Sequence, residues 1–165
     1  MRWTVALFAT LCCALSTAEA QSAKQYRIAW LVSTPSSVPS MKAAIASFQA
    51  ELRKFGYVEG KNLTVTYKFA DQGIDALGAH AKELAATKPD LILTDSSFAA
   101  LAAKGATTRV PILMAVSAAP VQQGLAASLA KPGGNITGMT LMAPQTAEKR
   151  LELLKLAVPR IKRVA

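Results

Sequence analysis

Cysteine is missing from the chain beyond its first 20 residues. Cys12 and Cys13 are the only two cysteines, and both lie in an apolar run near the N-terminus. From Gln21 onward a disulfide, a thiolate metal site and a cysteine nucleophile are therefore excluded. A fold without disulfides must be stabilised by its hydrophobic core, and the length after residue 20 is sufficient for one domain of ordinary size.

Residues that commonly carry catalysis are also scarce. His80 is the only histidine, and it falls in a segment with helical spacing, where we expect it to lie on the helix surface. The sequence contains no histidine pair, no HExxH and no Gly-x-Ser-x-Gly motif. It therefore offers no catalytic residue and no metal ligand set, and we predict a protein that is not an enzyme and needs no cofactor.

Glycine is absent where a nucleotide site requires it. The loop Ser33–Pro39, which follows the first predicted strand, has no glycine to admit a pyrophosphate, so a dinucleotide fingerprint is excluded. The segment Gly56–Asn62 (GYVEGKN) superficially resembles a phosphate-binding loop. Its glycine spacing is one residue too short, however, and Asn62 stands where the motif requires a hydroxyl residue after Lys61. It also joins a helix to a strand, whereas the motif requires strand, loop and helix in that order. We interpret it as a helix stop and a turn.

Long apolar runs are missing except at the N-terminus. Arg2 precedes the apolar run Val5–Leu15, and the small-x-small sequence AEA at 18–20 comes directly before Gln21. The run is too short for a membrane span, which needs about 20 residues. The pattern is typical of a secretory signal peptide. We therefore predict that residues 1–20 are a cleavable signal peptide and that the protein is periplasmic.

The net charge of +9 is not concentrated in any long basic run. Basic residues such as Lys42, Lys82 and Lys155 fall in separate predicted elements. We interpret the charge as a solvated surface with weak attraction to anionic membranes or solutes. We predict no nucleic-acid partner.

Strand patterns and helix patterns alternate regularly along the sequence. Arg27–Val32 is almost continuously apolar, as in a parallel strand buried on both faces, whereas the alternation in Leu63–Phe69 predicts an edge strand. Short connections between these patterns predict a doubly wound parallel sheet of the α/β class. Further strands are predicted at Asp90–Thr94, Ile112–Val116 and Ile136–Leu141, and helices at about Ser40–Phe55 (ended by Gly56), Ile74–Thr87, Phe98 onward, Val121–Leu129 and Gln145–Val158.

Small polar residues follow several of these strands. We predict the flavodoxin-like strand order 2-1-3-4-5, in which the third strand borders the crevice where ligands bind, outside the carboxyl ends of the strands. Hydroxyl groups there can donate and accept, and a helix start favours an anion such as a carboxylate. The same residue types are preferred helix N-caps, so Ser96 or Ser97 would cap the next helix whatever the function. The candidate binding residues at this end are Ser33, Thr34, Asp95, Ser96, Ser97, Ser117 and Thr140.

Three stretches of the chain resemble a known family. They are FQAELRKFGYVEGKNLTVTYKFAD from Phe48, AALAAKGATTRVPILMAV from Ala99, and GLAASLAKPGGNITGMTLMAPQTAEKRLELLKLAVPRIKRVA from Gly124. These stretches are similar to ABC-transporter substrate-binding proteins with the fold of type I periplasmic binding proteins. The resemblance implies two α/β lobes that close on a small solute, amino acids included, which a membrane permease then takes up.

The resemblance also implies how the chain is divided. Residues 24–141 are similar to the N-terminal lobe of the family, and residues 142–165 to the hinge and the first helix of an incomplete second lobe. A complete family member is about twice as long, so we expect this sequence to be truncated or a fragment. The resemblance favours a periplasmic solute-binding protein of an ABC import system; the alternatives are an exported sensor or interaction protein on the same fold, or a non-functional fragment.

Two positions depart from the family pattern. Ser96-Ser97-Phe98 stands where the family usually has Gly-Thr-Pro, and Ala119 stands where it often has an aspartate before the proline that matches Pro120. If that aspartate meets a ligand ammonium, Ala119 lacks this contact with an amino acid, and the alternatives are a different ligand or a degenerate copy of the gene. With the family in view, we expect the solute to lie against Ser33–Thr34, Asp95–Ser97 and Ser117–Ala119.

Overall fold

The structure is a computed structural model that describes residues 24–161 and 163. Its five strands form one parallel sheet in the order β2-β1-β3-β4-β5, as predicted, with β2 at an edge. The predicted signal peptide lies outside the described residues. The strands are β1 (Tyr26–Val32), β2 (Leu63–Phe69), β3 (Leu91–Thr94), β4 (Ile112–Ser117) and β5 (Ile136–Thr140), and the helices are α2 (Pro39–Lys54), the 3-10 turn η1 (Ile74–Ala76), α3 (Leu77–Ala86), α4 (Ser97–Ala106) and α5 (Ala143–Ala157).

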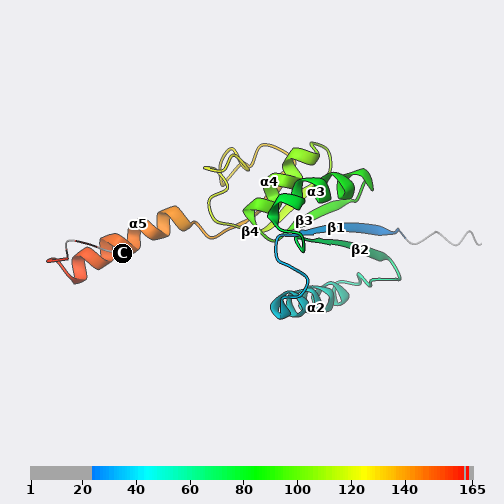
Figure 1. The fold of residues 1–165 in the computed structure, drawn as a ribbon, viewed down its shortest axis with the longest axis horizontal. Helices are drawn as coiled ribbons and strands as arrows, with labels where there is room; N and C mark the ends of the chain where they lie inside the picture. Colours follow the sequence, from blue (N-terminus) through cyan, green and yellow to red (C-terminus); the bar gives the residue numbers. More distant parts are fainter. Residues whose placement is uncertain (1–23, 162, 164–165) are drawn as a thin grey trace, which may run out of the picture.

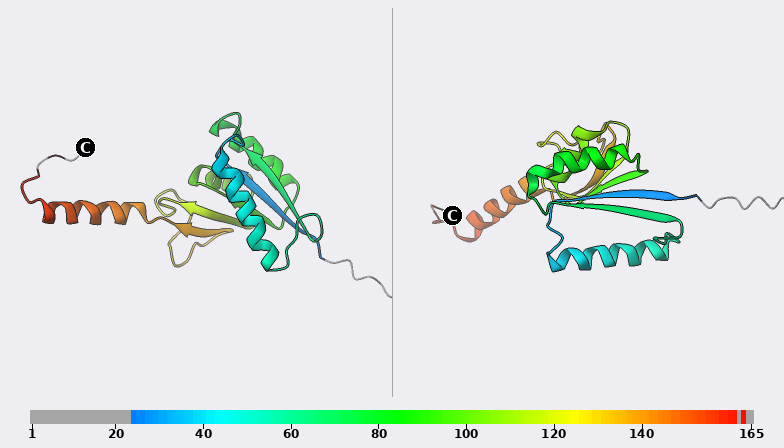
Figure 2. Two further views of the ribbon diagram at one scale, coloured as in Figure 1. Left: turned by 90° about the horizontal axis from the view of Figure 1, so that it is seen from below. Right: turned by 45° about the vertical axis from the view of Figure 1, so that its right-hand side comes forward.

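Helices cover both faces of the sheet (Figures 1 and 2). α2 lies on one face, and α3 and α4 lie on the other. The α3–α4 face holds the larger core, in which Leu31, Ile92 and Ile112 are fully buried. Burying one such side chain contributes about 1.5–3 kcal/mol. The class predicted from the alternating pattern is therefore confirmed, because each sheet face has a helix layer to cover it.

α2 packs through one stripe of apolar side chains. Its Pro39 stands at the first helical turn, where the fixed φ of proline is already helical. Phe48 meets the ring of Trp30 edge to face, with ring centroids 4.9 Å apart. Such a pair adds about 0.5–1.5 kcal/mol to the burial of its area. Gly56, with a φ of 83°, follows the helix in the left-handed conformation expected for a helix stop.

The helix predicted at Val121–Leu129 is wrong. Residues 120–124 form turns, and the backbone N–H groups of Leu125 and Ala126 both donate to the carbonyl of Pro120. Gly124 has a φ of 68°, which a right-handed helix does not allow. Of the apolar positions that suggested a helix, only Leu125 is buried. The helical spacing of Val121, Leu125 and Leu129 is therefore misleading, because only Leu125 packs into the core and the segment is a loop.

Gly138 is required where β5 pairs with β4. The register shifts between Met114 and Ser117, and Gly138 there has a φ of 151°. A Cβ atom on Gly138 would lie 2.2 Å from the carbonyl oxygen of Met114. Only glycine permits this close backbone approach. The irregular pairing brings the ends of the two strands, Ser117 and Thr140, into register.

α5 projects away from the sheet (Figures 1 and 2). It begins at Ala143, two residues before the start predicted at Gln145. Its Leu151, Leu153 and Leu156 are all more than half exposed, at 56%, 54% and 69%. Across the described part of the chain, no helix combines the length and apolar character that a bilayer span needs.

His80 lies on α3 as predicted, but it is only partly at the surface. The residue is half-buried, and its Nδ1 atom is shielded from solvent. α3 itself is shorter than the predicted helix, because Ile74–Ala76 forms a separate 3-10 turn before it.

Candidate functional site

The predicted polar residues gather at the carboxyl edge of the sheet. Thr94 of β3 pairs with Leu31 of β1 and with Met114 of β4, so the three strands end near one another. Because parallel strands all point the same way, the residues that follow them share this edge. The structure divides these residues among three groups: a loop bound by carboxylates, a hydroxyl pair with a cavity, and a second, smaller cavity.

The first group joins the end of β3 to the loop after β1. The backbone N–H of Ser33 donates to Asp95 Oδ1 at 2.8 Å, and the Thr34 hydroxyl donates to Asp95 Oδ2 at 3.3 Å. All three residues are half-buried. Three predicted site residues are therefore in contact, and the carboxylate of Asp95 binds the loop within the chain itself.

A matching contact was missed by the sequence reasoning. Asp71, which follows β2, accepts the backbone N–H of Ser36 at 2.6 Å and the Ser36 hydroxyl at 3.0 Å. The available signal was its position, because Asp71 follows the carboxyl end of a strand just as Asp95 does. The loop after β1 is thus bound by carboxylates from both neighbouring strands.

The second group surrounds the start of α4. Ser96 is the N-cap, since its hydroxyl accepts the backbone N–H of Ala99 at 3.2 Å, and this leaves Ser97 without the capping role. The hydroxyl oxygens of Ser97 and Ser117 lie 3.0 Å apart, and the Ser117 hydroxyl donates to Gln123 Oε1 at 3.3 Å. Ser117 is 1% exposed, so this chain of hydroxyls is anchored in the protein interior.

An open cavity of about 290 Å³ lies beside this hydroxyl pair. Its polar wall contains Ser97 and Ser117, and its apolar wall contains Phe98 and Leu141, which are 61% and 65% exposed. Sequence reasoning included Phe98 only as a departure from a family pattern and did not include Leu141. The arrangement offers hydroxyl donors, the partial positive charge of a helix start and an aromatic surface at one place. The cavity is lined by Ser96, Ser97, Phe98, Val116, Ser117, Ala118, Gln123 and Leu141.

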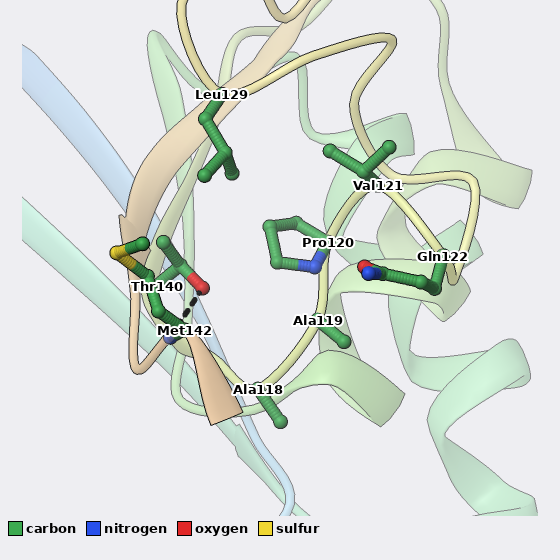
Figure 3. Close-up of a pocket in the computed structure, with 8 residues that line it drawn as sticks. All are labelled: Ala118, Ala119, Pro120, Val121, Gln122, Leu129, Thr140 and Met142. Carbon is green, nitrogen blue, oxygen red and sulfur yellow. Dashed lines mark hydrogen bonds between the residues drawn. The ribbon is translucent and has the colours of Figure 1, made fainter. Parts of the chain in front are cut away.

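The third group forms a smaller cavity of about 140 Å³, which shares Ala118 with the larger one (Figure 3). Here Ala119 and Thr140 line the same space, but the Thr140 hydroxyl accepts the backbone N–H of Met142 at 3.1 Å. The walls are mostly apolar, with Gln122 the other polar side chain. Lining residues are Ala118, Ala119, Pro120, Val121, Gln122, Leu129, Thr140 and Met142.

The arrangement suits binding of a small anion or polar solute. Within residues 24–161 and 163, no cluster of three or more histidine, cysteine, aspartate or glutamate residues could hold a metal ion. The carboxylates nearest the site, Asp71 and Asp95, are engaged with the loop after β1. What remains open to a ligand is a set of hydroxyl and backbone donors beside apolar side chains.

Comparisons with known proteins agree on one class. A family model described as "ABC transporter substrate binding protein" matches residues 28–165. The chain is 34% identical over 126 residues to the "Tyrosine-binding protein" of Clostridioides difficile (strain R20291), an alignment that covers 76% of this chain and 36% of that protein.

Two solved structures extend the comparison. A conserved domain protein from Vibrio cholerae matches with a TM-score of 0.69 at 29% identity, over 84% of this chain and 46% of that chain. An ABC domain in complex with L-Trp from Streptococcus pneumoniae matches with a TM-score of 0.63 at 26% identity, over 71% of this chain and 39% of that chain. The chain therefore spans less than half the length of these relatives.

Proposed function

The chain belongs to the family of ABC transporter substrate-binding proteins, and from this we propose that it is the solute-binding component of an ABC import system. Its sheet order is that of one lobe of a type I periplasmic binding protein. In the proposed assignment, residues 24–141 form the N-terminal lobe, and residues 142–165 form the hinge and the first helix of the second lobe. The protein works outside the cytoplasmic membrane and delivers its solute to a membrane permease.

The observation that carries this proposal is the cavity beside Ser97 and Ser117. Its hydroxyls and the start of α4 suit a carboxylate, and the exposed ring of Phe98 suits an aromatic or other apolar group. Of the three relatives above, one is named for tyrosine and one holds L-Trp. We therefore take an amino-acid-like solute, with aromatic amino acids as the first candidates, as the proposed ligand class.

Thermal denaturation in the presence of single solutes tests the proposal. The chain is heated with L-tyrosine, L-tryptophan and other amino acids, and with the related carboxylic acids that lack the ammonium group. A solute present at a hundredfold excess over its Kd stabilises a binder by about 2.7 kcal/mol. Isothermal titration calorimetry then confirms the stoichiometry. Absence of stabilisation by every solute in this set would contradict the proposal.

A second candidate function, an exported sensor or interaction protein, is favoured by one observation. Leu151, Leu153 and Leu156 on α5 are exposed, and such apolar surface often marks a protein–protein contact. Genes encoded beside this one distinguish the two functions. An adjacent permease and ATPase favour import, whereas an adjacent sensor kinase favours sensing.

A further inference from the structure

The loop between β1 and α2, Ser33–Val38, has little of its own to fix its shape. Its last residue, Val38, is the N-cap of α2 but makes no side-chain cap. Within the loop, the backbone N–H of Val38 donates to the carbonyl of Pro35 at 3.2 Å, and this bond closes a single turn. A loop of this length without further contacts samples several conformations, and ordering it on binding weakens the affinity.

Two carboxylates supply the missing contacts, and they do so in the same way. Asp95 accepts a backbone N–H from Ser33 on one oxygen and the Thr34 hydroxyl on the other. Asp71 accepts a backbone N–H and a hydroxyl from Ser36, again with one bond on each oxygen. Hydrogen bonds to an ionised acceptor are roughly twice as strong as neutral ones. Each aspartate thus holds the loop through two bonds.

The two aspartates act from opposite sides. β2 and β3 flank β1 in the sheet, so the residues that follow these strands stand on either side of the loop that follows β1. Asp95 binds the start of the loop and Asp71 binds its middle. Each carboxylate oxygen accepts one of these bonds, so about half of the acceptor capacity of each aspartate is engaged with the loop.

We propose that Asp71 and Asp95 are positioning residues that hold the Ser33–Val38 loop in the conformation used for solute binding. The last step of the inference rests on the proposed function. Ser33–Val38 does not line the cavity beside Ser97 and Ser117, so the loop matters to affinity only if the bound solute extends along the carboxyl edge of the sheet to reach it. The proposal assigns to Asp95 a role different from direct ligand contact. It assigns to Asp71 a role that sequence reasoning did not give it.

Hydrogen exchange in the chain without solute tests the positioning step directly. Asp95→Ala and Asp71→Ala should each speed amide exchange in residues 33–38, by about tenfold or more, while the amides of β1 and β3 keep their protection. Asp95→Asn should restore most of the protection, because its amide oxygen still accepts the Ser33 N–H. Asp75→Ala, which removes an exposed carboxylate from η1, is the matched control and should change nothing.

Solute affinity provides the second measurement. With whichever solute stabilises the wild-type chain, Asp95→Ala should weaken binding about tenfold and Asp95→Asn should retain most of it. Unchanged loop exchange in both alanine variants would overturn the proposal. An Asp95→Asn chain that binds as poorly as Asp95→Ala while its loop stays protected would also overturn it, because the charge itself would then be meeting the ligand.

The two measurements separate this inference from the proposed function. Hydrogen exchange needs no solute, so it reports on the loop alone. If no solute binds but the loop exchange responds as expected, the proposed function fails and the positioning of the loop stands. If either alanine variant does not fold, Thr34→Val and Ser36→Ala remove one side-chain bond from each carboxylate and should produce smaller increases in exchange at the same amides.

Discussion

The hydroxyl oxygens of Ser97 and Ser117 lie 3.0 Å apart and join the first residue of α4 to the last residue of β4. This contact closes the polar wall of the larger cavity. The two adjacent serines therefore differ in role. The Ser96 hydroxyl caps α4, whereas the Ser97 hydroxyl lines the cavity.

Ser117→Ala should weaken solute binding about tenfold while changing the free energy of unfolding by only about 1 kcal/mol, since one net hydrogen-bonded hydroxyl is lost. Calorimetric titration and chemical denaturation measure the two effects. Ser128→Ala, which removes a hydroxyl from the loop turn at Lys131, is the control and should leave affinity unchanged. If the Ser117→Ala variant binds solute as tightly as the wild type, the Ser117 hydroxyl does not contribute to solute binding.

Gly138→Ala should lower the free energy of unfolding by about 2–4 kcal/mol, because the new Cβ would collide with the Met114 carbonyl and the backbone would have to shift. Urea denaturation measures the change. Gly105→Ala is the matched control on α4, where an added Cβ meets nothing within 4 Å, and it should stabilise the chain by about 0.5–1 kcal/mol. An unchanged free energy of unfolding in the Gly138→Ala variant would contradict the close approach of Gly138 to the Met114 carbonyl.

Leu125→Ala should destabilise the chain by about 2–5 kcal/mol, as expected for a leucine that is 1% exposed. Leu129→Ala should change stability by less than about 0.5 kcal/mol, because that side chain is 48% exposed. Denaturation of the two variants side by side checks the prediction. Similar losses in both would favour the helix over the turn that the structure shows.

Lys68→Ala should raise the pKa of Glu83. The hydrogen bond from Lys68, whose Nζ lies 2.6 Å from Glu83 Oε2, holds the pKa of this carboxyl below its ordinary value, and the charge of Lys68 acts in the same direction. The pKa of Glu83 is lower in the folded chain than in the unfolded chain. The ion pair therefore stabilises the fold at pH values above the unfolded-state pKa of Glu83, and this contribution is lost as the pH falls through the folded-state pKa.

NMR titration of the Glu83 side chain measures that shift. Lys82→Ala, which removes a neighbouring lysine from α3, is the control and should leave the pKa of Glu83 where it is in the wild type. If the Lys68 variant titrates like the wild type, the ion pair does not form in solution.

Exposed leucines on α5 should cause the 165-residue chain to self-associate. Size-exclusion chromatography over a range of concentrations should show species larger than a monomer. The double variant Leu151→Glu and Leu156→Glu should elute as a monomer, whereas Lys149→Glu, a surface change on the same helix, should elute like the wild type. A monodisperse wild-type monomer at every concentration would contradict this prediction.

Most of the fold could be predicted because the apolar patterns of its strands are strong. Leu63–Phe69 was predicted with the bounds that the structure has, since the alternation of Leu63 and Val65 with threonines is a direct record of one buried and one exposed face. The segment after β4 was not predictable in the same way. Leu125 is held there by backbone bonds to Pro120 that no periodicity encodes.

The candidate site was predictable only to the level of which residues share an edge. Parallel topology brings the ends of β1, β3 and β4 together, so the proximity of Ser33 to Asp95 and of Ser97 to Ser117 follows from the strand order. Which oxygen binds which donor depends on distances of a few tenths of an ångström. That is why the role of Asp71 and the choice of Ser96 as cap came from the structure.

The close approach at Gly138 has one more consequence, which concerns the open side of the sheet. β5 is an edge strand, and an edge with unpaired backbone groups can template pairing with another chain. Met139 and Leu141 are exposed there and would make such pairing more favourable. The pairing of β5 with β4 is irregular in register, and irregularities of this kind bend a strand and make its edge a poor template. Gly138, which permits this irregular pairing, therefore makes β5 a poorer template for edge-to-edge pairing than a regular strand would be.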